Sequence, residues 1–285
     1  MDNISWRHHY LPVFYLKGFS KNGKLKIYDV EKKAFIQGGK EFSPKAYFFE
    51  KEGNIVKGIN NEKDDFIEKF YADFDTKMAE IITRISLSNN DKKYGVTETD
   101  MPVINHFVSL MYWRLPHKKE ELINIINNND LPTLGLNVFN QDGTLNEVRS
   151  EILKNNDSFP VIYKLFNSLM DSIRGLDCRT PYQISEKYHE FPYLCSDNPV
   201  IFEKDSFPNV YEDDYIFPLS GTRIFIKAQR PEIVSPIVVD TLLYKQAKRY
   251  VTCTDERYLE MLDNAFNKHN MTIEEYKTMC FKLLK

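Results

Sequence analysis

The hydrophobic pattern of this 285-residue chain changes twice between its two ends. Residues 24–37 alternate apolar and polar side chains around Glu31-Lys32, which predicts a β-hairpin. From residue 62 to residue 173, apolar side chains mostly recur every three or four positions, which is the period of a helix. Short β-rich runs return after Thr180. The pattern predicts an α+β fold with a largely helical middle and a small mixed or antiparallel sheet, built from the hairpin and the carboxy-terminal strands.

Capping and helix-breaking residues divide the helical middle. A helix is predicted over 62–87, and its apolar stripe consists of Phe66, Phe70, Phe74, Met78, Ile81 and Ile85. A capping sequence at 97–100 begins a second helix, which must kink or restart at Pro116. Helix returns over 146–173, with an interruption near 158–160. Other helices are predicted over 12–18, 238–250, 258–267 and 272–284, and strands over 182–186, 193–195, 200–202, 215–219 and 223–228.

The stretch 127–145 is the best candidate for an internal linker. It opens with three consecutive asparagines and also contains one proline and two glycines, which favour turns and irregular backbone. The sequence shows no repeat of 20 to 50 residues and no low-complexity tract. We therefore expect a single composite α+β domain over 1–285, with a flexible linker at 127–145.

Charge and cysteine usage limit the partners and the compartment. The 38 basic and 41 acidic residues give a net charge of −3, so nucleic acid would have to bind through a local basic patch. The first residues lack the apolar stretch of a secretory signal, and no run reaches the ~18 apolar residues of a membrane span. The four cysteines are scattered without a C-x-x-C pair. We expect a cytoplasmic protein with reduced thiols and no membrane contact.

Histidine and arginine residues near predicted helix ends are candidate functional side chains. His9, next to His8 before the first helix, has the chemistry of a metal ligand, a general base or a phosphate contact. The alternative is that one ring caps the helix or packs against Tyr15. Arg114 precedes the break at Pro116 and has a guanidinium group suited to a carboxylate or a phosphate.

Acidic residues supply the remaining candidates. Asp75 lies at the edge of the apolar stripe of the predicted helix, where it is a solvated surface residue, a functional carboxylate or an ion-pair partner of Arg114. Asp197 and Asn198 lie between two predicted strands in Ser-Asp-Asn-Pro. Such a turn is stabilised by its own side-chain hydrogen bonds, but its Asp also has the chemistry to bind a metal or activate a hydroxyl. Cys195, in an apolar strand, is expected to be an inert thiol.

Several common catalytic motifs are missing from the sequence. It contains no P-loop, no G-x-G-x-x-G, no G-x-S-x-G elbow and no protein-kinase signature set. These absences disfavour P-loop nucleotide triphosphatases, Rossmann dehydrogenases and typical α/β-hydrolases. The motifs alone name no reaction.

The order of the motifs resembles a bacterial domain-of-unknown-function family, number four-two-three-eight. Its H-Y-x-P-x-F-Y-L-x-x-F opening matches 9–19, and its late S-D-N-P and P-L elements match 196–199 and 218–219. An acidic residue in a long helix and a central R-x-P correspond to Asp75 and to Arg114 with Pro116. Two positions depart from the family pattern. Members usually have Glu at position 75, and an Asn expected in the late helix is replaced here by Asp240.

The resemblance implies a role in antiphage defence or as a toxin-like effector, because members are linked to mobile elements and some to antiphage defence. The first hypothesis is a hydrolase, a metal-dependent nuclease in particular. In it His9, Asp75 and Asp197 bind a divalent ion such as Mg²⁺ or Mn²⁺ or act as general base, and Arg114 holds a phosphate. Asn198, beside Asp197, is a further catalytic candidate. The second hypothesis is a non-catalytic binding or sensing module, in which these same residues are structural.

Overall fold

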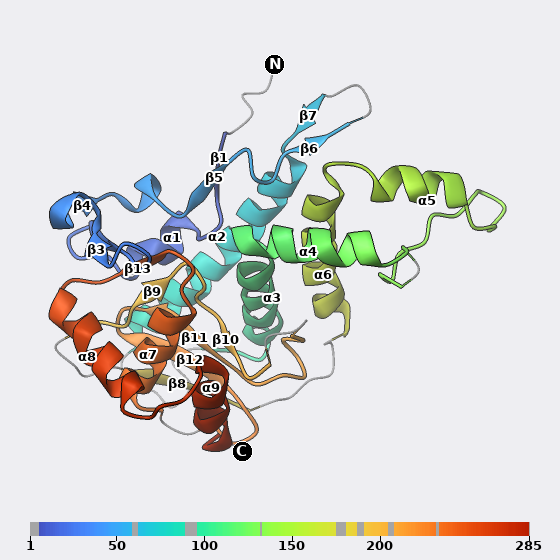
Figure 1. The fold of residues 1–285 in the computed structure, drawn as a ribbon. Helices are drawn as coiled ribbons and strands as arrows, with labels where there is room; N and C mark the ends of the chain where they lie inside the picture. Colours follow the sequence, from blue (N-terminus) through green and yellow to red (C-terminus); the bar gives the residue numbers. More distant parts are fainter. Residues whose placement is uncertain are drawn as a thin grey trace.

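The computed structural model describes residues 6–58, 62–88, 96–131, 133–174, 181–186, 191–204, 208–231 and 234–284. A run of helices over residues 66–174 lies between segments that contain the strands of small antiparallel sheets, which confirms the predicted α+β class (Figure 1). No helix among the described residues combines the length and the apolar character that crossing a bilayer requires. Residues 89–95, between the first two helices of the predicted helical middle, and Cys178 lie outside the described residues.

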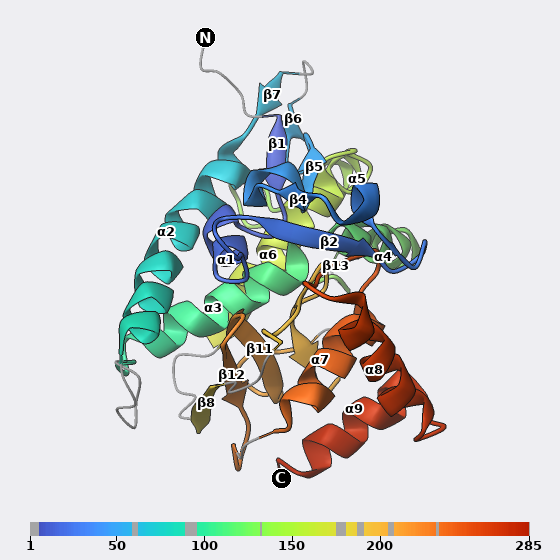
Figure 2. The ribbon, with the colours of Figure 1, turned by 90° about the vertical axis from the view of Figure 1, so that its left-hand side faces the viewer.

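Most of the helices fall into two packed groups. The helices are α1 (Val13–Lys17), α2 (Phe66–Leu87), α3 (Asp100–Trp113), α4 (Pro116–Asn128), α5 (Glu147–Lys154), α6 (Phe159–Arg174), α7 (Pro236–Gln246), α8 (Glu256–Asn267) and α9 (Ile273–Lys282). In one group α3 packs against α2 and α6, and α4 packs against α6. In the other, α8 and α9 both pack against α7, on the side of the molecule that carries the C-terminus (Figure 2).

The strands form two larger sheets and two short pairs. The strands are β1 (Arg7–His9), β2 (Leu25–Asp29), β3 (Ala34–Phe35), β4 (Glu41–Phe42), β5 (Phe49–Lys51), β6 (Val56–Lys57), β7 (Lys63–Asp64), β8 (Tyr182–Glu186), β9 (Cys195–Ser196), β10 (Ile201–Phe202), β11 (Tyr215–Ser220), β12 (Arg223–Lys227) and β13 (Tyr250–Thr252). One sheet has the order β10-β11-β12-β8, and the other has the order β3-β2-β13-β9 with β4 also paired to β2. The short pairs are β1-β5 and β6-β7.

The two ends of the chain meet in the second sheet. The predicted hairpin forms, with Tyr28 opposite Phe35, and β2 then pairs with β13 through Tyr28 and Val251. β13 pairs in turn with β9, which leads into the Ser-Asp-Asn-Pro segment. The prediction that the hairpin joins the carboxy-terminal strands is therefore confirmed.

The strand that makes this junction falls where a helix was predicted. The helix over 238–250 ends at Gln246, and β13 begins at Tyr250. The helix stops because Ala247 adopts an extended backbone, with φ −57° and ψ 136°. The backbone N–H groups that follow bind a carboxylate of another segment instead of helix carbonyls, as described below.

The first half of α2 also departs from the predicted stripe. The helix begins at Phe66, since the preceding residues form β7, and Phe66 is 43% exposed. Ile67 and Tyr71 are buried in its place, whereas Met78 and Ile81 are buried as predicted. The buried face is thus shifted by one residue at the start of the helix. This shift leaves Asp75 half-buried beside the α3 helix.

The break at Pro116 is confirmed as a restart. α3 ends at Trp113, and α4 begins at Pro116, whose ring suits the first turn of a helix. Between α4 and α5 the described residues contain one isolated bridge, Phe139–Leu145. Neither the linker nor the single domain is tested by this geometry, and both stay predictions.

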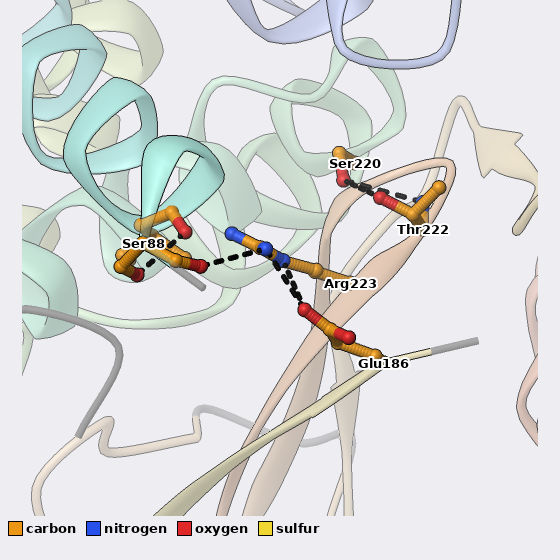
Figure 3. A network of polar contacts seen from close by, with 6 residues as sticks. Ser88, Glu186, Ser220, Thr222 and Arg223 are labelled. Carbon is orange, nitrogen blue, oxygen red and sulfur yellow. Dashed lines mark hydrogen bonds and ion pairs between the residues drawn. The ribbon is translucent and has the colours of Figure 1, made fainter. Parts of the chain in front are cut away.

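A polar network joins the end of α2 to the first sheet. Arg223 on β12 forms an ion pair of 2.8 Å with Glu186 on β8 and donates a hydrogen bond of 3.1 Å to the backbone carbonyl of Ser88 (Figure 3). In the adjoining turn, the hydroxyl groups of Ser220 and Thr222 lie 3.2 Å apart. These contacts fix α2 against the strands.

Candidate functional site

Arg114 and Asp75 form a bidentate ion pair between the end of α3 and the middle of α2. The Arg114 guanidinium nitrogens lie 2.8 and 3.4 Å from the two carboxylate oxygens of Asp75. The guanidinium also lies 4.4 Å from the ring centroid of Tyr71, at cation–π distance. Burial opposes the charged form of Arg114, but Asp75, together with Tyr71 and Glu68, raises its pKa above the usual value. Of the alternatives left open by the sequence, the geometry matches the ion pair.

His9 lies close to this ion pair. Its imidazole donates a hydrogen bond to the backbone of Lys45 and packs 5.6 Å from the ring centroid of Phe49. Burial lowers the pKa of His9, and the nearby charge of Arg114 lowers it further, against the opposing effect of Asp75. The Nε2 atom is buried and has no hydrogen-bond partner among the described residues. His9 is therefore near enough to Asp75 and Arg114 for their charges to act on its pKa, and its imidazole is neutral.

The Asp197 carboxylate accepts hydrogen bonds from three consecutive backbone N–H groups. The donors are the backbone nitrogens of Lys248, Arg249 and Tyr250, at 2.7 to 2.9 Å. Burial raises the pKa of Asp197, and these three hydrogen bonds partly offset that effect. The carboxylate replaces the helix carbonyls that these N–H groups would otherwise bind, and it fixes the connection between α7 and β13.

Asn198 also joins the Ser-Asp-Asn-Pro segment to the end of α7. Its Nδ2 donates to the backbone carbonyl of Gln246 at 3.2 Å, and the Gln246 amide donates back to the carbonyl of Asn198 at 2.5 Å. Gln246 also donates to the carbonyl of Val200 at 3.2 Å. The Ser-Asp-Asn-Pro segment is thus locked to the end of α7 by side chains in both directions.

The arrangement does not fit the predicted metal site. His9, Asp75 and Asp197 do not form a metal-binding group, and the part of the chain that the structure describes holds no cluster of three or more His, Cys, Asp or Glu side chains that could hold a metal ion. The Asp75 carboxylate is bonded to Arg114, and that of Asp197 to three backbone N–H groups. A divalent cation would have to displace these partners from both carboxylates. We derive no chemistry through a metal.

A cavity of about 670 Å³ lies beside these residues and is named the Tyr10 pocket. It brings together the β1–α1 junction, β5, the first turns of α4 and the connection from α7 to β13. Its lining consists of Tyr10, Phe49, Glu50, Pro116, His117, Lys119, Glu120, Ile123, Asp197, Lys248, Arg249 and Tyr250. Of the predicted site residues, Asp197 lines this pocket, whereas His9 and Arg114 are close to it in sequence, next to Tyr10 and two residues before Pro116. Asp75 lines a separate groove on α2.

The pocket combines neutral hydrogen-bonding groups with charges of both signs. Burial, followed by the charge of Asp197, raises the pKa of Tyr10 well above its usual value, so the phenol stays protonated. Burial lowers the pKa of His117 to about 3, helped by the nearby Lys118 and Lys248, so this ring is neutral at pH 7. The charged residues on the lining are three cationic side chains and three carboxylates.

Lys164 of α6 lies next to the pocket as a buried amine. Its Nζ donates to the backbone carbonyl of Arg114 at 3.2 Å, and the residue is 1% exposed. Burial lowers the pKa of Lys164 to about 8, whereas Glu50 acts in the opposite direction. By contrast, burial raises the pKa of the Cys195 thiol well above its usual value, as an inert thiol requires.

Sequence reasoning missed most of the pocket. Lys248 and Arg249 had been assigned to a helix, although the run Lys-Arg-Tyr is a basic-aromatic signal that could have been noticed. Lys164 interrupts the apolar face of its helix between Val161 and Leu165, which is the pattern of a buried lysine. Glu50 carries no comparable signal, because nothing local distinguishes it from a solvated strand residue.

Comparison with known proteins identifies the family of this chain. The model of the family described as Protein of unknown function (DUF4238) matches residues 7–235, which is well over half of the chain. The chain belongs to this family. The predicted resemblance is therefore confirmed for DUF4238, and the matched range covers the Tyr10, Glu50 and Asp197 parts of the pocket but not Lys248. No curated protein and no solved structure matches the chain.

Proposed function

We propose that this DUF4238 chain is a binding module for a nucleotide unit, either free or at the end of a single strand, and that the Tyr10 pocket is its site. The observation that carries the proposal is the lining of this pocket: aromatic rings, exposed basic side chains and carboxylates surround one cavity of about 670 Å³. That volume is within the range of about 300–1,000 Å³ typical of small-molecule sites.

The basic side chains at the pocket match the phosphate of such a ligand. Lys248 is exposed and Lys119 is half-buried, and neither takes part in an ion pair with another described residue. Arg249 lies 3.6 Å from Asp29 and therefore carries a partly compensated charge. Lysine ammonium groups bind phosphate as point charges, so Lys119 and Lys248 are the natural anchors.

The aromatic and acidic side chains match the base and the sugar. Tyr10, Phe49 and Tyr250 line the pocket, and aromatic faces stack on any base regardless of sequence. Glu50 and Glu120 supply carboxylate oxygens, which accept hydrogen bonds from base amino groups and from ribose hydroxyls. The mixture of charges favours a single nucleotide unit over a long polyanion, because three carboxylates would repel a continuous phosphate backbone.

Isothermal titration with the four ribonucleoside 5′-monophosphates tests the proposal. We expect at least one nucleotide to bind, and the double variant Lys119→Glu/Lys248→Glu to weaken its binding about tenfold or more, since two anchors become repulsive. Lys268→Glu is the matched control, because Lys268 is an exposed lysine that does not line the pocket. Absence of binding by all four nucleotides, or equal loss in the control, would contradict the proposal.

A hydrolytic effector is the second candidate, and Lys164 is the observation that favours it. A buried amine with a pKa near 8 is partly able to donate and accept a proton at neutral pH, which general acid–base catalysis requires. Glu50 and Lys119 influence this pKa and line the pocket, so the amine is close to the proposed nucleotide. The role assigned to Lys164 is proton transfer in a nuclease that operates without a metal at His9, Asp75 and Asp197.

Cleavage of an end-labelled oligonucleotide in the presence of a chelator tests this second candidate. We expect wild-type protein to cleave the strand, and Lys164→Met, with circular dichroism unchanged, to lose at least about a hundredfold in rate. Cleavage by Lys164→Met at the wild-type rate, or no cleavage by wild-type protein, removes the candidate and leaves the binding module.

A role in antiphage defence is a proposal at the level of the cell. Its support is the family membership together with a pocket suited to nucleotides. A bacterial host expressing the chain should form fewer plaques than a host expressing Lys119→Glu/Lys248→Glu at an equal protein level. Equal plaque numbers across a panel of phages would contradict this role.

A further inference from the structure

A second cavity, of about 210 Å³, lies where the β2 hairpin meets residues 191–194 and the start of α8, and it is named the lysine cavity. Three lysines line it, Lys21, Lys24 and Lys26, together with Glu41 and Thr254 and an inner wall of aromatic and apolar residues. It shares no lining residue with the Tyr10 pocket. It is therefore a separate site.

The backbone fixes two of the three lysines side by side. Lys21 and Lys24 exchange two backbone hydrogen bonds, of 2.9 and 3.0 Å, across a tight turn. The two central residues, Asn22 and Gly23, have φ of 53° and 71°, the left-handed conformation that Asn and Gly tolerate best. The backbone of both lysines is thus fixed by a defined turn, so that no main-chain ordering is needed when they bind a ligand.

The charges of these lysines are not neutralised within the described residues. None of Lys21, Lys24 and Lys26 belongs to an ion pair there. Glu41 is the one acidic residue in the lining. Asp255 is close enough for Lys26 to lower its pKa, but its carboxylate accepts hydrogen bonds from Arg257. Three cationic side chains against one carboxylate leave a positive cavity in a chain whose net charge is −3.

The opposite wall adds no negative charge. Burial raises the pKa of both Tyr193 and Tyr258, so each phenol is neutral at pH 7. The Tyr258 hydroxyl donates to the buried carboxylate of Asp240, which also accepts the backbone N–H of Leu194 at 2.9 Å. The Asp240 carboxylate is thus hydrogen-bonded to residues of the wall and does not line the cavity itself. The exposed Thr254 hydroxyl is a further hydrogen-bonding group at the rim.

We propose that the lysine cavity binds a phosphate dianion, either free or as the phosphate group of a small monoester. Three lysines that line one small space are complementary to a compact double negative charge. Pockets for small molecules usually have volumes of about 300 Å³ or more, and this cavity is smaller. The ligand therefore carries few atoms beyond the phosphate. A base and a ribose do not fit with it, which distinguishes this site from the Tyr10 pocket.

Isothermal titration with inorganic phosphate and with glycerol 3-phosphate tests the proposal, with glycerol as the uncharged comparison. Both phosphates should bind and glycerol should not, and the tighter phosphate identifies the free or the esterified form as the ligand. Lys21→Gln/Lys24→Gln should weaken binding about tenfold or more, because two exposed cationic anchors are lost. Thr254→Phe, which fills the rim without touching a charge, should weaken binding by a comparable factor.

Lys33→Gln is the matched control, because it removes an exposed lysine from the neighbouring turn of the same hairpin, outside the cavity. This control should bind phosphate as wild-type protein does. The proposal is overturned if neither phosphate binds, or if Lys33→Gln weakens binding as much as Lys21→Gln/Lys24→Gln. It is also overturned if binding survives unchanged in both Lys21→Gln/Lys24→Gln and Thr254→Phe.

Discussion

The ion pair between Arg114 and Asp75 shows how a single residue can serve the fold and the site together. The Arg114 side chain is 1% exposed, and its backbone carbonyl accepts the hydrogen bond of Lys164. The residue therefore joins α2, the end of α3 and α6 at one point, two residues before the pocket begins at Pro116. Loss of this pair should disturb the stability first and the pocket second.

Asp75→Ala should strongly destabilise the protein. It leaves the buried guanidinium of Arg114 without a carboxylate, and removing one partner of a buried pair costs about 3–5 kcal/mol. Because the Asp75 side chain is 20% exposed, we expect the loss in free energy of unfolding to be at the lower end of this range. Urea unfolding measures it, with Asp73→Ala as the control, because Asp73 is an exposed carboxylate on the same helix. A loss below about 1 kcal/mol would show that the pair is not a main determinant of stability.

His106 should make stability depend on pH. Its ring stacks on Phe74 with centroids 4.2 Å apart, and burial lowers its pKa from 6.5 to about 4. Between pH 6.5 and 4 the unfolded chain therefore binds a proton that the folded chain does not. The contribution of the neutral His106 to the free energy of unfolding is fully present above pH 6.5 and is lost as pH falls towards 4. At pH 4.5 this effect lowers the free energy of unfolding by an amount on the order of 2 kcal/mol.

Comparing His106→Phe with wild-type protein isolates this effect, because Phe keeps an aromatic ring against Phe74 but does not titrate. Urea unfolding at pH 7.0 and pH 4.5 should show a smaller loss of stability in the variant. An identical pH dependence in both proteins would show that His106 does not reject a proton in the folded state.

The connection between α7 and β13 is the element on which the site depends. Three consecutive backbone N–H groups, of residues 248–250, bind Asp197 and no helix carbonyl. A helix-period pattern continues through these residues in the sequence, which is why a helix was predicted there. The competing carboxylate comes from about fifty residues earlier, and such a partner is invisible to local patterns.

Asp197→Asn should weaken this element. An amide keeps one acceptor oxygen but presents N–H groups to backbone donors, so at least one hydrogen bond is lost and a buried donor is left unpaired. We expect a loss of about 1–3 kcal/mol in urea unfolding. Asp73→Asn is the matched control on an exposed surface and should change stability by less than about 0.5 kcal/mol. An equal loss of stability in Asp197→Asn and Asp73→Asn would contradict the role of Asp197 as acceptor of these backbone hydrogen bonds.

At the scale of the whole molecule, the sequence predicted the fold class better than the site. Helical and strand periodicity located α3, α6, β8, β11 and β12 because each is long enough to show its own pattern. β13 has three residues and exists through its pairing with β2 and with β9, whose position the predicted strand over 193–195 touched only at Cys195. The meeting of Tyr10 with Lys248 and Arg249 depends on that pairing, so no local pattern contains it.

Both of the carboxylates predicted to bind a metal, those of Asp75 and Asp197, already have partners in the folded chain. Asp75 pairs with Arg114, and the charges of both residues act on the pKa of His9. Asp197 lines the Tyr10 pocket, and its carboxylate is bound by backbone N–H groups. Sequence patterns identify candidate carboxylates, but only the folded chain shows which of them already have partners.

Photolabelling with 8-azidoadenosine monophosphate tests the central claim, that the Tyr10 pocket is a nucleotide site. After irradiation and proteolysis, we predict label on peptides that contain Tyr10, Phe49 or Tyr250, with labelling suppressed by excess unmodified adenosine monophosphate. Lys119→Glu/Lys248→Glu should remove the label from these peptides, and Lys268→Glu should not. Label confined to other peptides, or label that excess nucleotide does not suppress, would contradict the account.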